Sequence, residues 1–430
     1  MRSNPALLAC VGVLTLAWPT LAPAQAPIPL SGGGPAPVAA VDPATIQGLP
    51  SARDYRPPQG IVFKTADFIS ENVRLTAQWF YAPKNEGENE GRKLPTVIMA
   101  HGWGATAANY RQDAVDLARA GYLVMLFDYR GWGDSDGRVM LTSPRFVAGG
   151  AFAGGSVAGG TFTGEVRELR GYIDPWEQVE DWFNAVSYAA TDPRVDAGRI
   201  GVLGSDLSGG HVIYVAAHEP RIKALVSQVT RADTRPSRPF QLDPARVIAE
   251  ADAAASRIAA GQAQYPAERA RAPGAQGGAQ GRAQGGGLVG APVGNRVVRW
   301  APVEEAHDVT APALFVLAEK EELFSNTANG QLACERVQGP RKMVMLPRIT
   351  HYDIYGAERA RAVTAAIDWF DRYLKPPKLE PGGAPTRVPI NRKDPERGAC
   401  NPPPLPPAGE EPKEGSGQGH KAPATSGRFN

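Results

Sequence analysis

The sequence predicts a protein of the α/β class, in which a mostly parallel β-sheet is covered by helices on both faces. Apolar segments of strand length alternate along the chain with longer segments of helical periodicity. Most of these strand segments are continuous apolar runs, as expected for strands buried on both faces of a parallel sheet. The chain has 430 residues of which 43% are hydrophobic, enough to build a substantial core.

The predicted elements follow from these patterns in chain order. The first two strands alternate apolar and polar residues, which is typical of antiparallel strands. Asp174 followed by Pro175 is typical of a helix start, and Gly121 is typical of a helix end. The predicted strands are residues 61–70, 72–83, 95–102, 122–131, 199–204, 222–230, 312–319 and 342–347. The predicted helices are residues 110–121, 174–191, 209–218, 326–337 and 359–374.

Two segments interrupt this alternation within a predicted domain of residues 55–375. Residues 147–164 form a glycine-rich loop, and residues 232–300 form an insertion with one helical stretch followed by a Gly/Gln/Ala run. The insertion follows the strand at residues 222–230, so we expect it to cover the carboxyl edge of the sheet as a lid.

The two ends of the chain are predicted to lie outside this domain. Residues 1–26 have the layout of a secretory signal peptide, with Arg2, an apolar run and then small residues. The apolar run is too short for a membrane span, so we expect a periplasmic or secreted protein with no stable membrane insertion. Residues 27–54 are interpreted as a linker and residues 376–430 as a Pro-rich disordered tail.

Cysteine content and charge limit the partners that we expect. Removal of the signal peptide leaves Cys334 and Cys400, which either form a disulfide or remain two separate thiols. The net charge of +2, with both signs mixed, gives no basic field for nucleic acid. Cysteine, histidine and carboxylate spacings predict no metal site and no cofactor. A small molecule is the expected substrate, and the sequence does not indicate an oligomeric state.

The stretch GVLGSDLSGG, residues 201–210, is typical of a sharp strand-to-helix turn that exposes a nucleophile. In such a turn the residues two before and two after the nucleophile must be small, because the strand and helix backbones crowd there. With Asp206 as the nucleophile these neighbours are Gly204 and Ser208, which are both small. We therefore predict Asp206 as the nucleophile.

Two serines are the alternative nucleophiles. Ser205 would have Leu203 and Leu207 as its crowded neighbours, and Ser208 would have Asp206 two residues before it. Both arrangements place a large side chain where a small one is needed. Asp206 is therefore favoured over Ser205 and Ser208 on steric grounds.

Five blocks of the sequence together resemble a known family. They are PTVIMAHGWG (95–104), FDYRGWGDSDG (127–137), RIGVLGSDLSGGHV (199–212), LFVLAEKEELF (314–324) and THYDIY (350–355). Their order resembles that of α/β-hydrolases of the dienelactone-hydrolase and acyl-peptidase-like branch, over roughly Asp54 to Lys375. The resemblance implies an α/β-hydrolase fold with a nucleophile, acid, histidine order, and relatives usually carry serine at position 206.

The resemblance also implies the partners of the nucleophile. His351, after the last predicted strand, occupies the place of the catalytic base, and Glu321 aligns with the acid that orients it. Glu319 and Glu322 are close competitors for that role. The HGWG turn follows a buried strand, so the backbone N–H groups of Trp103 and Leu207 are predicted to form an oxyanion hole.

Other polar residues of these blocks are interpreted as structural. His101 is expected to form structural hydrogen bonds, and His211 and His218 are expected to pack on the helix that follows the nucleophile. Asp128, Arg130 and Asp134 are expected to satisfy backbone groups of a turn.

Three functions follow from this arrangement. A carboxylate nucleophile suits an sp³ carbon that bears a leaving group, so the first is a hydrolase with a triad of Asp206, His351 and Glu321 and a covalent aspartyl ester. Haloalkane dehalogenases and epoxide hydrolases work in this way, although they usually have tryptophan where Leu207 stands.

The second function is that of an ester, lactone or acyl-peptide hydrolase that uses a serine or an activated water. The third is a binding protein that has lost its nucleophile, and a lyase that uses Asp206 or His351 as a base remains a further alternative.

Overall fold

The computed structural model describes residues 49–83, 93–142, 165–236, 243–263 and 291–375, together with Cys400. All of them fall in one compact unit that spans residues 41–430. The predicted signal peptide, the glycine-rich loop at 147–164, the Gly/Gln/Ala run and all of the tail except Cys400 lie outside the described residues. None of the described helices is long and apolar enough to cross a membrane.

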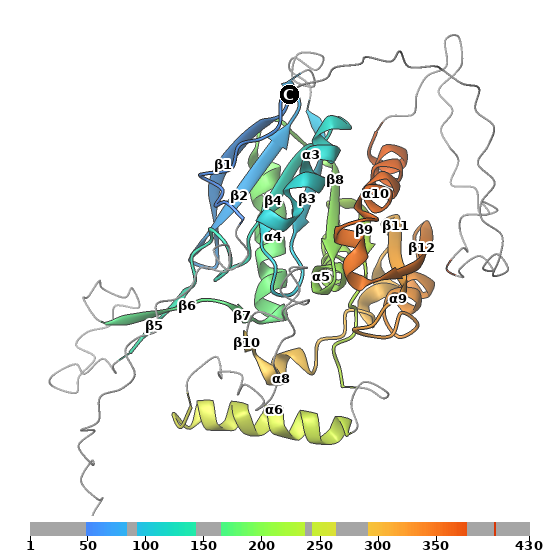
Figure 1. The fold of residues 1–430 in the computed structure, drawn as a ribbon. Helices are drawn as coiled ribbons and strands as arrows, with labels where there is room; N and C mark the ends of the chain where they lie inside the picture. The colour runs from blue at the N-terminus through green and yellow to red at the C-terminus, as the bar shows by residue number, and fades with distance from the viewer. Residues whose placement is uncertain are drawn as a thin grey trace, which may run out of the picture. The chain divides into compact units, whose positions relative to one another are not determined.

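An eight-stranded sheet forms the centre of the fold, with the order β1-β2-β4-β3-β8-β9-β11-β12 (Figure 1). The strands are β1 (Val62–Ser70), β2 (Val73–Tyr81), β3 (Leu94–Ala100), β4 (Leu123–Phe127), β8 (Val195–Ser205), β9 (Ile222–Gln228), β11 (Ala313–Lys320) and β12 (Arg341–Thr350). Strand β2 pairs antiparallel with both β1 and β4, and the pairs from β4 to β12 are parallel. The predicted mostly parallel sheet is therefore confirmed.

Helices cover both faces of this sheet and bury two hydrophobic cores. The helices are α3 (Arg111–Arg119), α4 (Pro175–Thr191), α5 (Leu207–His218), α6 (Pro244–Ala259), α8 (Gly294–Val297), α9 (Gly330–Arg336) and α10 (Arg359–Leu374). One core contains residues of α4, α5 and α9, such as Trp182 and Val212, and the other contains residues of α3 and α10, such as Leu117 and Phe370. Fully buried strand residues contribute to both cores because the sheet is covered on both sides.

Several boundaries differ from the sequence-based expectation. Strand β8 is longer than predicted, and helix α5 begins at Leu207, directly after Asp206, instead of at Gly209. Helix α9 is shorter than predicted because it begins only at Gly330. The predicted start of α4 is confirmed: Asp174 accepts hydrogen bonds from the first turn, and Pro175 is the first helical residue.

The predicted insertion contributes helices α6 and α8, which lie side by side beyond the edge of the sheet at which α4 begins (Figure 1). Its short strand β10 (Ala291–Pro292) pairs with β7 (Tyr172–Ile173). The neighbouring β5 (Arg138–Leu141) and β6 (Val166–Leu169) form a separate two-stranded ribbon. None of the residues of α6 is buried, so this helix lies on the surface of the described structure.

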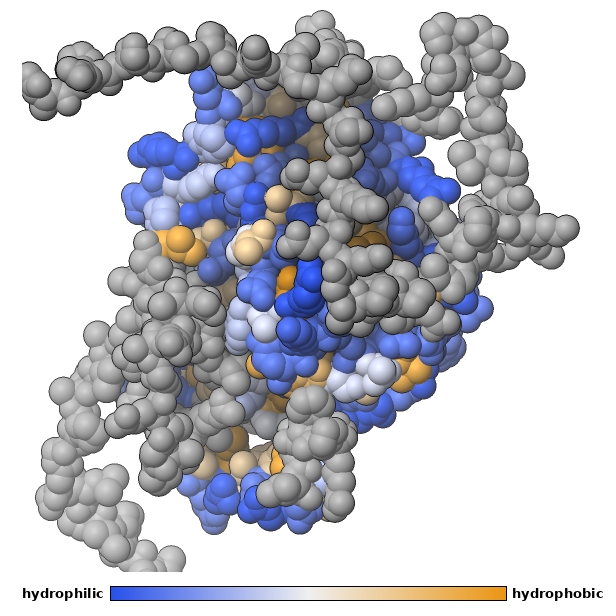
Figure 2. All heavy atoms as spheres, turned by 45° about the vertical axis from the view of Figure 1, so that its right-hand side comes forward, coloured by the Kyte–Doolittle hydropathy of each residue, from blue (hydrophilic) through white to orange (hydrophobic). Residues whose placement is uncertain are grey.

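The outer surface is largely polar, and a disulfide holds one point of the C-terminal region. The face drawn in Figure 2 is mostly hydrophilic, with small separate apolar areas. Cys334 on α9 is bonded to Cys400, 66 residues further along the chain, and both side chains are buried. The bond therefore fixes a residue of the tail against the hydrolase-like body.

Candidate active site

The turn between β8 and α5 has the geometry of an exposed-nucleophile elbow. Asp206 has φ 54° and ψ −120°, a conformation that non-glycine residues rarely adopt. A Cβ atom placed on Gly204 would lie 2.1 Å from the Ser208 carbonyl oxygen, and one on Gly102 would lie 2.9 Å from the Ser205 carbonyl oxygen. These two glycines let the strand, the helix and the 101–104 turn meet around Asp206.

The Asp206 carboxylate faces the 101–104 turn with one oxygen bound and the other without a partner. The Trp103 N–H donates to Asp206 Oδ2 at 2.9 Å. Asp206 Oδ1 is buried and has no hydrogen-bond partner among the described residues. The Asp206 side chain does not cap α5, since it forms no capping hydrogen bond with the first turn of that helix. Trp103 therefore holds Asp206 as an oxyanion-hole donor would, and Leu207 as a second donor stays a prediction.

The two alternative nucleophiles are fully buried and already hydrogen-bonded. Ser205 Oγ lies 2.8 Å from Tyr355 Oη, and Ser208 Oγ lies 3.0 Å from Tyr129 Oη. Both serines have 0% relative exposure. Neither hydroxyl occupies the apex of the turn, which is formed by Asp206 alone.

His351 stands at the end of β12, on the short helix η3 (His351–Tyr355), and pairs with one of the three predicted carboxylates. Its Nδ1 lies 2.9 Å from Glu321 Oε2 and 3.0 Å from Oε1. The other two glutamates accept from backbone groups: Glu322 from the His351 N–H at 2.9 Å and Glu319 from the Arg348 N–H at 2.5 Å. Glu321 is therefore the carboxylate that orients the imidazole ring.

The charges around His351 favour its protonated form. Burial alone would lower its pKa, but the hydrogen bond that His351 donates to Glu321 and the negative charges of Asp206, Glu321 and Glu322 raise the pKa above the ordinary value. The negative charge of Asp206 is thus close enough to His351 to raise its pKa. Nδ1 is engaged by Glu321, which leaves Nε2 for proton transfer.

Two buried tyrosines also belong to this site, although the sequence did not indicate them. The Gly102 N–H donates to Tyr110 Oη at 3.3 Å, and the Tyr110 and Tyr355 rings pack edge to face. Burial is the main cause that raises the pKa of each tyrosine, and the charge of Asp206 raises both further. Tyr355 lies within the THYDIY block, so its proximity to His351 was the signal available in the sequence.

Arg231 is the other residue near Asp206 that sequence reasoning missed. It follows β9 by three residues, and its backbone N–H donates to the Asp206 carbonyl oxygen at 3.0 Å. Its guanidinium carbon lies 5.0 Å from the ring centre of Trp103 and 5.9 Å from that of Phe324. The one available signal was a charged residue just after a buried parallel strand, because such positions collect at the carboxyl edge of the sheet, but this signal does not say which groups Arg231 contacts.

Of the three histidines interpreted as structural, His101 and His211 are buried and His218 is exposed. His101 Nδ1 lies 3.0 Å from the Gly102 carbonyl oxygen, and burial lowers its pKa to about 4. Burial likewise lowers the pKa of His211 to about 3. His218 Nδ1 lies 2.8 Å from the Tyr214 carbonyl oxygen, and these two rings stack on α5.

The turn at residues 128–134 follows the expectation for two of its three charged residues. Asp128 accepts from the Ala107 N–H at 2.7 Å, and Asp134 accepts from the Ala52 N–H at 2.6 Å. Arg130 instead binds the buried Asp181 carboxylate at 2.6 Å, so its side chain joins β4's end to α4 and does not cap the turn. The backbone role predicted for Arg130 is therefore wrong.

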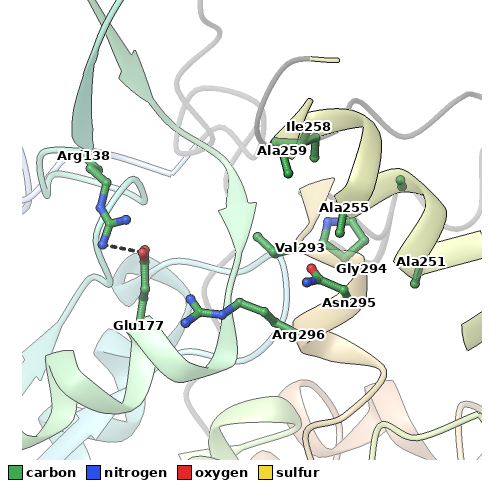
Figure 3. A pocket seen from close by; sticks show the side chains of 12 residues that line it. Arg138, Glu177, Ala251, Ala255, Ile258, Ala259, Val293, Gly294, Asn295 and Arg296 are labelled. Carbon is green, nitrogen blue, oxygen red and sulfur yellow. Dashed lines mark ion pairs between the residues drawn. The ribbon is translucent and has the colours of Figure 1, made fainter. Parts of the chain in front are cut away.

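A separate cavity of about 330 Å³ lies between α6, α8 and the start of α4 (Figure 3). Ala255, Ile258 and Val293 form an apolar wall, and the Arg138–Glu177 ion pair lies opposite. None of the predicted catalytic residues lines this cavity. Among the described residues, no group of three histidine, cysteine or acidic side chains is placed to hold a metal ion.

Comparisons with known proteins match the fold and part of the sequence. A sequence model of the X-Pro dipeptidyl-peptidase (S15) family matches residues 71–282. The chain is similar to the quorum-quenching protein AidA of Acinetobacter baumannii, with 29% identity over 39% of this chain and 43% of the relative. It is also similar to an uncharacterized 31.7 kDa Escherichia coli protein, with 31% identity over 38% of this chain and 44% of the relative. The matched region thus spans less than half of these curated relatives.

A fungal relative and two solved structures extend the comparison. Thiohydrolase aneE of Aspergillus aculeatus is 28% identical over 33% of this chain and 34% of its own length. The α/β hydrolase GrgF of Penicillium has a TM-score of 0.54 at 18% identity, over 73% of this chain and 99% of that one. A hypothetical protein of Pseudomonas aeruginosa has a TM-score of 0.53 at 18% identity, over 75% of this chain and 97% of that one.

The structural likeness establishes the fold, and the sheet order, the elbow and the family match agree with it. The central sheet carries its sharp turn after β8, and the histidine follows the last strand. This chain therefore has an α/β-hydrolase fold, as its sequence predicts.

Proposed function

We propose that this protein is a hydrolase in which Asp206 is the covalent nucleophile, His351 the base and Glu321 the acid that orients it. One observation carries the proposal: Asp206 occupies the strained elbow with Oδ2 bound to the Trp103 N–H and Oδ1 without a described partner. A carboxylate held in this way has one oxygen fixed and the other available for attack.

In the first step Asp206 Oδ1 attacks an sp³ carbon that bears a leaving group. The new C–O bond forms as the bond to the leaving group breaks, and the leaving group departs with the electron pair. The product is an ester between the Asp206 carboxyl group and the alkyl group of the substrate. A carboxylate nucleophile needs no base to remove a proton from it before the attack.

In the second step His351 removes a proton from a water molecule, and the hydroxide attacks Cγ of Asp206. The negative charge of the tetrahedral intermediate develops on Oδ2, the oxygen that already accepts from the Trp103 N–H. The alcohol then leaves with Oδ1 and the proton from His351, and the new carboxyl group, which holds one oxygen from water, releases the second proton of that water to regenerate the Asp206 carboxylate. Glu321 stabilises the imidazolium that forms in between.

A second candidate is an acyl hydrolase in which Asp206 and His351 activate a water for direct attack on a carbonyl group. The comparisons favour this candidate, because the matching family is named for a peptidase and the Aspergillus relative is named a thiohydrolase. The buried, hydrogen-bonded Ser205 and Ser208 do not support a serine nucleophile within it. The two candidates differ in whether Asp206 ever becomes covalently bound.

Isotope labelling in a single turnover distinguishes them. Enzyme in excess over an alkyl halide, an epoxide or an activated ester is allowed to react once in H₂¹⁸O, and the peptide that contains Asp206 is weighed by mass spectrometry. We expect ¹⁸O in Asp206 and unlabelled oxygen in the released alcohol. If ¹⁸O appears in the product alone, water attacks the substrate directly and the covalent route is wrong.

Two variants give a readout that needs no natural substrate. His351→Gln should accumulate the Asp206 ester, because the first step does not use the histidine. Asp206→Ser should react with a fluorophosphonate probe at position 206, while the wild-type protein should not react. Labelling of wild type at Ser205 or Ser208 would show a serine hydrolase, and absence of labelling in both proteins together with no turnover would indicate a binding protein.

We also propose that the protein acts on a small molecule in the periplasm or outside the cell. The signal-peptide layout of residues 1–26 supports this, and so does the Cys334–Cys400 disulfide, since such bonds persist in oxidising compartments. Cell fractionation together with the N-terminal sequence of the mature protein tests it. Cleavage after Ala24 or Ala26 is expected, and recovery of the uncleaved chain from the cytoplasm would contradict the proposal.

A further inference from the structure

Arg231 is held beside the nucleophile by the backbone that follows β9. The Asp206 N–H donates to the Gln228 carbonyl oxygen at 3.0 Å, and the Arg231 N–H donates to the Asp206 carbonyl oxygen at 3.0 Å. Between them, Val229 has φ 36°, a strained conformation for a β-branched residue, and it is fully buried. This strain sets the position of Arg231 relative to Asp206, as strained residues often do at functional sites.

The helix of the elbow also fits closely against this segment. A Cβ atom on Gly209 would lie 3.3 Å from the Thr230 Cα atom, and one on Gly210 would lie 2.4 Å from the Arg231 carbonyl oxygen. Ser227 Oγ lies 2.6 Å from Thr230 Oγ1 and donates to the Gly209 carbonyl oxygen at 2.9 Å. The backbone at Arg231 is therefore as firmly placed as that of Asp206.

The guanidinium group lies against two aromatic rings that belong to the catalytic groups. The Trp103 ring is one, and its own backbone N–H binds Asp206 Oδ2. The Phe324 ring is the other, and its centre lies 5.6 Å from that of the His351 ring. The positive charge of Arg231 thus lies near the ring of the residue that binds Asp206 Oδ2 and near a ring that contacts His351.

This guanidinium forms no ion pair or hydrogen bond with any described residue, and its Nε is buried without a hydrogen-bond partner. Neighbouring arginines differ in this respect. Arg235 binds both Asp233 and Glu304, and Arg336 binds Glu304. Asp233, only two residues from Arg231, is directed to Arg235 instead. A fixed, partly buried cation with unused donors is costly unless something negative binds it.

We propose that Arg231 binds a carboxylate group of the substrate, so that the substrates are small organic acids with the reacting carbon close to the carboxylate. The planar fork of a guanidinium matches the two oxygens of a carboxylate. Such a substrate would be held with its acid group against Arg231 and its reacting carbon towards Asp206 Oδ1. The positive charge also offsets repulsion between the substrate and the Asp206 carboxylate. This inference rests on the proposed function for the position of the reacting carbon, but not for the binding of the acid.

Binding of unreactive acids tests the inference without any turnover. Propionate and benzoate are titrated into the full chain by calorimetry, each against its neutral amide, propionamide or benzamide, at constant ionic strength. We expect at least one of the two acids to bind more tightly than its amide. Arg231→Gln should weaken the binding of that acid by about 10- to 100-fold and leave the amide unchanged.

Two further variants separate recognition of the acid from a structural role. Arg231→Lys keeps the charge but loses the fork, so it should recover only part of the affinity. Arg235→Gln removes a nearby arginine that is already paired, and it should not change binding. Thermal unfolding of each variant identifies any loss of fold. Equal binding of acid and amide by wild type, or equal loss of both in Arg231→Gln, would overturn the inference.

A reactive pair links the inference to catalysis. Bromoacetate and bromoacetamide present the same carbon and leaving group with and without a negative charge, and release of bromide is measured for both. Wild type should prefer bromoacetate in kcat/KM, and Arg231→Gln should lose this preference mainly through KM. If neither compound releases bromide, covalent alkylation of Asp206 is contradicted for this class of substrate, and the binding of the unreactive acids still decides the role of Arg231.

Discussion

The two sides of the first turn of α5 carry similar polar groups but place them in opposite environments. On one side the Asp206 carboxylate has an oxygen without a described partner, and it faces a histidine that is paired with Glu321. On the other side Ser208 and His211 surround the hydroxyl of Tyr129, with no carboxylate among those partners. The pKa of the histidine is raised on the first side, whereas burial lowers that of His211 to about 3 on the second.

This difference shows that burial by itself does not make a reactive group. His351 and His211 are both almost fully buried. Only His351 has negative charges around it that outweigh the loss of hydration. The side with a paired histidine and an incompletely bound carboxylate is suited to chemistry, and the other side is suited to holding α5 in the core.

The largest expected effect comes from removing the Asp206 carboxylate. Asp206→Asn should lower kcat by at least about 10³-fold, because the amide is a poor nucleophile while the shape is kept. Ser208→Ala, two residues away, is the matched control and should keep kcat within about threefold, because its hydroxyl only bonds Tyr129 inside the core. Steady-state kinetics on any substrate found by the labelling experiment measures both. A larger loss of kcat in Ser208→Ala than in Asp206→Asn would contradict the roles proposed for the two residues.

The second prediction concerns the pH dependence set by His351. The base must be neutral to activate water, so kcat should rise with pH through a pKa above the ordinary histidine value of about 6.5. Glu321→Gln removes the negative charge that is hydrogen-bonded to His351, so the pKa of His351 should fall and the rise of kcat should occur at lower pH. The same change should reduce kcat by roughly 10²-fold or more. Glu319→Gln is the control, since Glu319 binds the Arg348 backbone.

The same histidines should affect stability in opposite directions. The raised pKa of folded His351 contributes stability that is present below about pH 6.5 and is lost as pH rises through the folded pKa. The lowered pKa of about 3 for His211 and about 4 for His101 means that the unfolded chain takes up protons first, so stability falls below about pH 6.5. Among His101, His211 and His351, only His351 should titrate above pH 6 in the folded state, as followed by histidine ring NMR signals, and a titration of His211 above pH 6 would contradict this account.

The third prediction tests the steric basis of the elbow. Gly204→Ala would bring a methyl group against the Ser208 carbonyl oxygen, where only backbone can yield, so we expect a loss of about 2–3 kcal/mol in the free energy of unfolding. Gly198→Ala is the control in the same strand, because the nearest atom to its Cβ is a side-chain oxygen of Asp196 at 3.2 Å. Urea unfolding measures both variants, and equal stability would show that the elbow can relax.

Much of this arrangement could be predicted from the sequence because it depends on local patterns. The continuous apolar strands and the Asp174–Pro175 helix start predicted the sheet and α4, and the small residues around Asp206 predicted the elbow. The position of Arg231 could not be predicted in this way. Its proximity to Trp103 and Phe324 joins residues from three distant loops, and the strained Val229 that positions it has no sequence signature.

The partners of the candidate catalytic groups show the same limit. The resemblance placed Glu321 beside His351, but three glutamates within four residues could be separated only by their contacts. Arg130 was expected to satisfy backbone groups of its own turn. Instead it binds Asp181 on α4, because the packing of that helix brings the buried Asp181 carboxylate to the guanidinium. Contacts between elements far apart in the chain are decided by packing, which no local pattern records.

The smallest expected effect comes from removing the buried Tyr129 hydroxyl, which Ser208 and His211 contact from α5. The Tyr129 hydroxyl accepts from Trp182 Nε1 at 2.7 Å and lies 3.0 Å from Ser208 Oγ and 3.1 Å from His211 Nδ1. Tyr129→Phe would leave these buried groups without that partner and should cost about 1–2 kcal/mol in the free energy of unfolding. Because none of them faces the Asp206 carboxylate, kcat of the folded protein should stay within about threefold. A large loss of kcat at unchanged stability would instead show that the two sides of the turn are coupled, and Tyr129 would then have to be counted as a positioning residue for Asp206.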